Sequence, residues 1–185
     1  MSGSNAPAIQ AERLYDELLV TLVQAGDRAA ANRLAARWQP RLARTAMRLL
    51  GSRDAALSAV QDSWVAILRG IGSLRDPARF APWVFGILHR RCVDHIRRMQ
   101  VKRGQAGELE SEPAAAIGDA DDALAVRQAI AGLPPDQQLA AQLFFIEGLT
   151  LAEIAEVQQV PLGTAKSRLF HARRQLKAAL SGDVP

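Results

Sequence analysis

A stripe of side chains suited to DNA recognition lies near the C-terminus of the chain. On a helix of 3.6 residues per turn these side chains share one face. They combine positive charge for phosphates, hydrogen-bonding groups for base edges, and an aromatic ring for contact with a thymine methyl group. The spacing therefore predicts a helix that reads the major groove of duplex DNA. The stripe consists of Lys166, Ser167, Phe170, His171 and Arg174.

The residues before this stripe supply the other elements of a helix-turn-helix. Thr150 and Glu153 have the spacing of a capping box, which predicts a short helix ending near Gln158. Pro161 then opens a long helix that reaches about Leu180. The basic residues could also form a solvated basic helix end, because Lys and Arg favour helix C-termini. A short helix, a tight turn and a basic helix in this order favour DNA binding over that alternative.

A second cationic face is predicted on a helix from 79 to about 98. Arg90, Asp94 and Arg97 cluster on one half of this helix with Trp83. Arginines beside a partly exposed ring suit unpaired nucleic acid, since the arginines hold the backbone while the ring stacks on a base. Trp83 and Phe80 are the candidate stacking residues, and burial of either ring in the core is the alternative. The opposite, apolar half carries Val84, Ile87, Leu88, Cys92 and Ile96.

Charge is divided into blocks that the net value of +4 conceals. Residues 37–103 hold 14 Lys and Arg against four acids, a balance of +10, which indicates a polyanionic partner. Residues 104–122 hold six acids and no base among many small residues, which is typical of a linker.

Several classes of protein are excluded by composition. The longest apolar runs are well short of the roughly 20 residues that a membrane span needs, so we expect no membrane insertion and a cytoplasmic location. A single cysteine, Cys92, excludes an internal disulfide. His89, Cys92 and His95 spread over about 120° of helix surface with no fourth ligand nearby, so we expect no metal and no cofactor. Since no catalytic motif occurs, we predict that the chain is not an enzyme.

The chain is predicted to be all-α, with two small helical domains joined by a flexible acidic linker. We expect a helical domain at 9–102, the linker at 103–122 and a helix-turn-helix domain at 123–182. Gly26 and Gly51 are predicted to end the first two helices, and Pro40 to kink or break the second. The third helix, 54–69, is predicted to bury Leu57, Val60, Trp64, Ile67 and Ile71, and to expose Ser58, Gln61, Asp62 and Val65. A short helix is predicted from Leu124 to Leu133 and another from Gln137 to Glu147.

Short motifs over 16–100 and 124–180 resemble the extracytoplasmic-function sigma factors of bacterial RNA polymerase. The second region is the more specific, with Glu147-Gly148-Leu149-Thr150 and the string Gly163-Thr164-Ala165-Lys166-Ser167-Arg168-Leu169. The first region carries Ala25-Gly26-Asp27, Arg48-Leu49-Leu50-Gly51, Val60-Gln61-Asp62, Pro82-Trp83-Val84 and Asp94-His95-Ile96-Arg97-Arg98.

The resemblance implies a transcription initiation subunit that directs core RNA polymerase to promoters. It implies contacts with the clamp helices and flap of the polymerase, with promoter DNA, and with an anti-sigma factor. The first domain would melt and read the −10 element, and the second would read the −35 element. By this resemblance Ser58, Gln61, Asp62 and Val65 bind core polymerase. Thr164, Lys166, Ser167, Phe170, His171, Arg173 and Arg174 bind the −35 element, and Ser73, Arg75, Asp76, Phe80, Trp83, Arg90, Asp94 and Arg97 bind the −10 element.

Four features depart from the family pattern, and two of them are Gln159 in place of the turn glycine and His171 in place of a usual arginine. Residues 55–58 replace an acidic string of the polymerase-binding patch, so we expect weaker core binding. Arg90 replaces the usual asparagine of the −10 helix, so we expect an altered −10 preference. The rival functions are a helix-turn-helix repressor or activator, a polymerase-binding regulator that does not initiate, and a recombinase-like enzyme. A repressor leaves the Trp83 face unexplained. A recombinase-like enzyme would need a carboxylate triad, and none stands out in this sequence.

Overall fold

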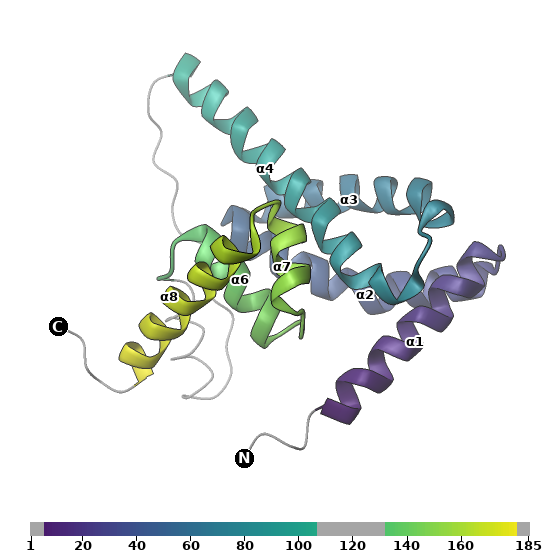
Figure 1. Cartoon of the computed structure of the whole chain (residues 1–185). Helices are drawn as coiled ribbons and strands as arrows, with labels where there is room; N and C mark the ends of the chain where they lie inside the picture. Colours follow the sequence, from purple (N-terminus) through teal and green to yellow (C-terminus); the bar gives the residue numbers. More distant parts are fainter. Residues whose placement is uncertain (1–5, 107–131, 181–185) are drawn as a thin grey trace.

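A computed structural model describes residues 6–106 and 132–180, and every regular element within them is helical (Figure 1). The prediction of an all-α protein is therefore confirmed. In the first half, residues 6–106, α1 (Ala6–Gln24), α2 (Arg28–Leu50) and α3 (Arg53–Gly70) are joined to α4 (Phe80–Ala106) through the 3-10 turns η1 (Ile71–Ser73) and η2 (Pro77–Arg79). In the second half, residues 132–180, the helices are α6 (Pro135–Phe145), α7 (Leu151–Gln158) and α8 (Leu162–Leu180).

The first residues of the predicted linker, 103–106, belong to α4. This helix was predicted to end near residue 98, but it extends to Ala106. The rest of that linker and most of the predicted helix at 124–133 lie outside the described residues. None of the described helices is long and apolar enough to cross a membrane.

Local capping sets the ends of the first helices. Asp27 begins α2 by accepting hydrogen bonds from the backbone N–H groups of Ala29 and Ala30. Gly51 ends the same helix with a φ of 65°, a left-handed conformation that glycine adopts without steric cost. Pro40 was predicted to kink or break α2, and it does not break it, because α2 is one continuous helix. Trp38 and Leu42 are fully buried on either side of the proline, and their packing holds both turns in place.

The main buried core runs through both halves of the molecule, and a smaller second cluster lies within the second half. Trp38 lies at its centre, with the Phe80 ring edge-on at 5.1 Å and the Phe85 ring at 5.6 Å. Leu143 and Ile154 of the second half belong to the same buried cluster. Accordingly, α6 packs against α2 and α7 packs against α4 (Figure 1).

Two predicted core residues are exposed. Leu57 is 50% exposed because α3 turns the smaller side chains of Ala56, Ala59 and Ser63 inward, which places Leu57 off the buried face. Ile96 is 37% exposed because α4 projects beyond the rest of the molecule towards its C-terminal end (Figure 1).

Candidate nucleic-acid interface

The helix-turn-helix forms as the capping pattern predicts. The Thr150 hydroxyl accepts a hydrogen bond from the N–H of Glu153, whose carboxylate accepts one from the N–H of Thr150 at 2.6 Å. Arg168 of α8 then donates to Gln158 at 3.1 Å and pairs with Asp136 of α6. Arg168 thus ties the three helices of the second half together, and its guanidinium is directed away from the DNA-reading face.

The tight turn between α7 and α8 stores a small strain. Gln159 has a φ of 55° and is the one described residue other than glycine with a positive φ. A residue with a side chain loses about 1–2 kcal/mol of folding free energy in this conformation, and glycine avoids that loss. Glycine is also more flexible in the unfolded chain, which cancels part of the gain. We expect Gln159→Gly to raise the free energy of unfolding by about 0.5–1 kcal/mol. Urea unfolding followed by circular dichroism checks this, and an equal gain from Gln175→Gly on α8 would contradict it.

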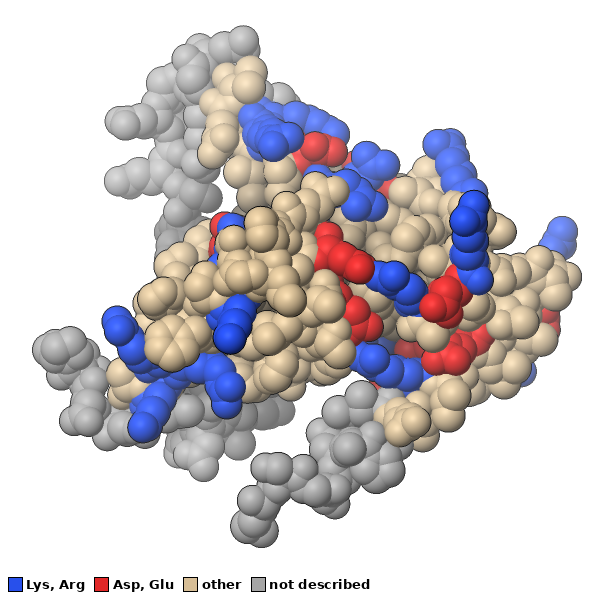
Figure 2. Space-filling model, in the orientation of Figure 1, with Lys and Arg blue, Asp and Glu red and all other residues tan. Residues whose placement is uncertain are grey.

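The predicted two faces of α8 are both present. Its apolar seam packs inward, since Ala165, Leu169, Ala172 and Leu176 are all buried. On the other side the Phe170 ring is 62% exposed and meets the His171 ring edge-on at 5.6 Å. Basic side chains gather over α8 in the space-filling view (Figure 2). The exposed predicted residues are Lys166, Ser167, Phe170, His171, Arg173 and Arg174, and Thr164 is half-buried at the start of the helix.

A cavity of about 500 Å³ lies where the loop before α4 meets that helix. Gln24 holds the loop in place by donating hydrogen bonds of 2.8 Å to the carbonyls of Ile71 and Leu74. The cavity is open to solvent and combines cationic and aromatic walls, a composition that suits an unstacked base and its phosphate. It is lined by Leu74, Arg75, Asp76, Arg79, Pro82, Trp83, Gly86 and Arg90, together with Glu156 from the second half.

The structure separates the two aromatic candidates. Trp83 is half-buried and lines the cavity, and Gly70 leaves room for its ring, because a Cβ there would lie 3.0 Å from the indole. Phe80 is 1% exposed, so the prediction that its ring is available for stacking is wrong. Phe80 begins α4 directly beside Trp38, and the core covers its ring.

The other predicted −10 residues are only partly gathered at the cavity. Arg75, Asp76 and Arg90 line it, whereas the Ser73 hydroxyl turns away to donate to the carbonyl of Gly70 at 2.7 Å. Further along α4, Asp94 is half-buried and Arg97 is exposed. The sequence analysis missed Arg79, Pro82, Gly86 and Glu156 as cavity residues, since their meeting depends on tertiary packing.

The outer face of α3 forms a separate exposed patch. Ser58, Gln61, Asp62 and Val65 are all exposed, as predicted. Leu68, 64% exposed, extends this patch by one turn and was not predicted. An i, i+4, i+7 spacing from Gln61 through Val65 to Leu68 could have identified it.

Of the three possible metal ligands on α4, Cys92 is buried, and His89 and His95 are half-buried. Cys92 is buried, and burial raises the pKa of its thiol to about 12, so the thiol stays protonated. His89 lies against α7, and burial lowers the pKa of its imidazole. The charges of Arg168 and Arg90 act in the same direction, while Asp136 and a backbone hydrogen bond with Val157 oppose the shift.

The half-buried His89 predicts stability that depends on pH. Because its pKa in the folded chain lies below the ordinary value near 6.5, the unfolded chain binds the proton more readily. The contribution of neutral His89 to the free energy of unfolding is complete above about pH 6.5. It is lost as the pH falls from there through the lowered pKa of His89. We expect His89→Gln to reduce the loss of stability between about pH 7 and pH 5.5, measured by urea unfolding. His95→Gln, at a half-buried site on the same helix, is the control, and an equal reduction there would contradict the assignment.

Comparison with known proteins places both halves in one family. Residues 34–101 match the family described as Sigma-70 region 2, and residues 123–176 match Sigma-70, region 4. The ECF RNA polymerase sigma-E factor of Salmonella typhimurium is 30% identical over 180 residues, covering 89% of this chain and 94% of the relative. The chain belongs to the extracytoplasmic-function sigma factors.

Another curated relative and two solved structures are also similar to this chain. The RNA polymerase sigma-H factor of Pseudomonas aeruginosa is 29% identical, covering 89% of this chain and 93% of the relative. The sigma factor RpoE of Bartonella quintana, solved with the anti-sigma factor NepR, shares the fold with a TM-score of 0.71 at 24% identity, covering 83% of this chain and 98% of that one. CnrH, solved with the cytosolic domain of CnrY, shares it with a TM-score of 0.63 at 22% identity, covering 92% and 99% of the two chains.

As a sigma factor, the protein directs promoter-specific transcription by RNA polymerase. The α3 patch and every cavity residue except Glu156 lie within the residues that match region 2. Glu156, α7 and most of α8 lie within those that match region 4.

Proposed function

We propose that this sigma factor reads the −35 element as duplex with the exposed face of α8, and the melted −10 element with α4 and the preceding loop. Residues 9–102 form the −10 and core-binding domain, 103–122 the linker, and 123–182 the −35 domain. The observation that carries the proposal is the pairing of two different cationic surfaces on one chain. One is a convex helix face suited to a groove, and the other is a cavity suited to a single base.

The −10 contacts rest on the composition of the cavity. Trp83 offers a partly exposed ring, and Arg79 and Arg90 flank it with positive charge. Proteins bind single strands by stacking bases on aromatic rings and by pairing basic side chains with backbone phosphates. Arg90 replaces an asparagine of the family pattern, so a guanidinium contributes to the choice of −10 sequence here.

The proposed partners of the other surfaces follow from the family. The α3 patch binds the clamp helices of core polymerase, and the second half binds the flap. The neighbouring structures include sigma factors solved with anti-sigma factors, which supports an anti-sigma partner for this chain. We infer that the protein acts in the cytoplasm, where polymerase and promoter DNA are, and that it initiates transcription without itself being an enzyme.

Run-off transcription with purified core polymerase on a genomic promoter library tests the proposal. We expect discrete starts that share two upstream elements and that disappear when the sigma factor is omitted. Asp62→Ala, in the α3 patch, should reduce the transcript yield, whereas Asp54→Ala, an exposed acid in the first turn of the same helix, should not. Core binding without any start would favour the regulator that does not initiate, an interpretation to which the missing acids at 55–58 lend support.

A further inference from the structure

A line of three residues along α4 forms one wall of the cavity. Trp83, Gly86 and Arg90 are spaced i, i+3 and i+7, so they lie on one face of the helix in consecutive turns. An aromatic ring and a guanidinium are therefore separated by one residue without a side chain. The cavity that this line borders has about 500 Å³, which is in the size range of pockets that hold whole small ligands, so a purine base fits.

The Trp83 ring is fixed in place from two sides. It packs on Phe80 with 5.9 Å between the ring centroids, and its outer edge lies against Gly70, where a Cβ would be 3.0 Å from the indole. Phe80 is itself buried beside Trp38. A ring held in this way stacks on a base without losing much side-chain freedom.

Gly86 keeps the middle of the line free of side-chain atoms. A glycine inside a helix is less stable than an alanine, and its advantage is that another group can approach the backbone closely. The backbone does not require glycine here, because Gly86 lies inside α4 and has no positive φ. A Cβ at Gly86 would lie 3.5 Å from Nη1 of Arg90, so the guanidinium folds back over Gly86. We call the space over Gly86, between the Trp83 ring and the Arg90 guanidinium, the base slot.

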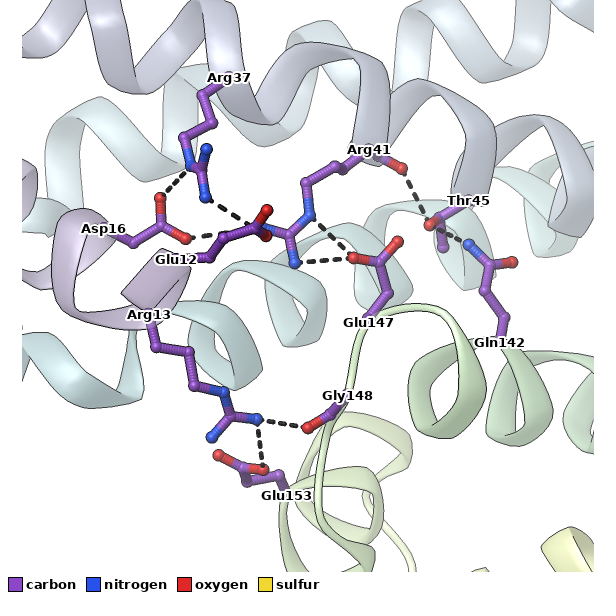
Figure 3. Close-up of polar contacts among 10 residues, drawn as sticks. All are labelled: Glu12, Arg13, Asp16, Arg37, Arg41, Thr45, Gln142, Glu147, Gly148 and Glu153. Carbon is purple, nitrogen blue, oxygen red and sulfur yellow. Dashed lines mark hydrogen bonds and ion pairs between the residues drawn. The ribbon is translucent and has the colours of Figure 1, made fainter. Parts of the chain in front are cut away.

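Arg90 has no acidic partner among the described residues, so its donors are available to a ligand. Other arginines of the first half are already engaged. Arg13 and Arg41 pair with glutamates of the second half (Figure 3), and Arg79 pairs with Glu156 in the cavity wall. The charge in the base slot that is left for a ligand is therefore that of Arg90.

An unpaired guanidinium beside a stacking ring favours guanine among the four bases. Its fork donates two parallel hydrogen bonds to O6 and N7 of guanine. Adenine presents an amino donor beside N7, and the carbonyl oxygens of thymine are separated by an N–H, so neither base satisfies the fork. Unpaired cytosine offers N3 and O2, but its single ring covers less of the Trp83 indole. Arg75, exposed on the loop before α4, is left to hold a phosphate.

We propose that the base slot selects an unpaired guanine of the −10 strand, with Trp83 as the stacking residue and Arg90 as the reader of the base edge. Gly86 keeps the slot open and lets the Arg90 guanidinium lie against the helix. This inference rests on the proposed function and names the base that its −10 surface prefers.

Binding of single strands by the reconstituted holoenzyme tests the proposal. The probes are short labelled strands of thymidine whose central base is guanine, cytosine, adenine or thymine. Fluorescence anisotropy measures their affinities, and core polymerase alone gives the background. We expect the guanine strand to bind more tightly than the adenine and thymine strands by about 5- to 150-fold, the range for one bidentate contact with a base. The cytosine strand should lie between them.

Arg90→Lys separates base reading from charge. Lysine keeps the positive charge but lacks the planar fork, so most of the guanine preference should disappear while the thymine strand binds nearly as before. Arg97→Lys is the matched control, because Arg97 is an exposed arginine of the same helix that does not line the cavity. This control should keep the guanine preference.

Gly86→Ala tests the floor of the base slot with two readouts of opposite sign. The added methyl group occupies the slot, so the guanine strand should bind more weakly. The urea midpoint of the free chain should rise, because alanine favours the helix. A merely structural role of Gly86 does not weaken binding while it stabilises the fold. Gly163→Ala, at a helical glycine of α8 with open space around it, should leave strand binding unchanged.

The outcomes distinguish this inference from the proposed function. Equal binding of all four strands, with normal run-off transcription, would overturn the base slot while the proposed function stands. A guanine preference that Arg90→Lys leaves intact would overturn it as well. Absence of any strand binding above that of core polymerase would overturn the proposed −10 surface, and the base slot with it. Displacement of the guanine strand by an equal concentration of guanosine monophosphate would indicate a site for a free nucleotide and overturn the assignment to the promoter strand.

Discussion

Trp38→Ala lowers the free energy of unfolding by about 3–5 kcal/mol, the range for deleting a large buried ring. Trp38 has no exposed surface, and its indole packs on Phe80 and Phe85. Domains of this size are stable by about 5–15 kcal/mol, so the loss is a large share of the total. Urea unfolding followed by circular dichroism measures it.

The same substitution also affects a contact between the two halves. The guanidinium of Arg41 lies 3.8 Å from the Trp38 ring centroid and forms an ion pair with Glu147 of the second half. Trp38→Phe should lose less stability than Trp38→Ala, because a ring remains and the indole N–H, which has no partner among the described residues, is removed. Trp64→Ala is the control at a half-buried tryptophan, and a loss there as large as at Trp38 would contradict the central role of Trp38.

Local signals predicted the helix-turn-helix almost completely. The Thr150 and Glu153 capping box depends on residues three apart, and the seam from Ala165 to Leu176 depends on helical periodicity alone. Such features need no knowledge of the rest of the fold. For the same reason the exposure of Lys166, Ser167, Phe170, His171 and Arg174 on α8 was predicted correctly, whereas Thr164 is half-buried.

Features that depend on tertiary neighbours were less predictable. Periodicity shows which side of α4 is apolar, yet burial of Phe80 follows from the position of Trp38 in another helix. Leu57 and Ile96 fit an apolar stripe but lack neighbours to cover them. No local pattern predicts how the two halves pack together. The ion pairs that join them are Arg13 with Glu153, Arg41 with Glu147 and Arg79 with Glu156, and the partners of each pair are more than 60 residues apart.

Lys166→Ala reduces transcription from promoters that depend on the −35 element by about 5- to 150-fold, the equivalent of one specific contact worth about 1–3 kcal/mol. Lys166 is exposed in the first turns of α8, and the early residues of a recognition helix are those that contact base edges. The measurement is run-off transcription on a promoter found in the library and on variants of its −35 element.

Lys177→Ala is the matched control, because Lys177 is an exposed lysine eleven residues later on the same helix. Eleven residues return to nearly the same face but lie about 16 Å further along the axis, beyond the bases that the first turns reach. A lysine that only neutralises phosphate should weaken all promoters alike, whereas one that reads bases should lose its effect when its own base pair is changed. Equal losses for Lys166 and Lys177 on every −35 variant would make α8 a general cationic surface, and the promoter choice would then rest on α4 and its cavity.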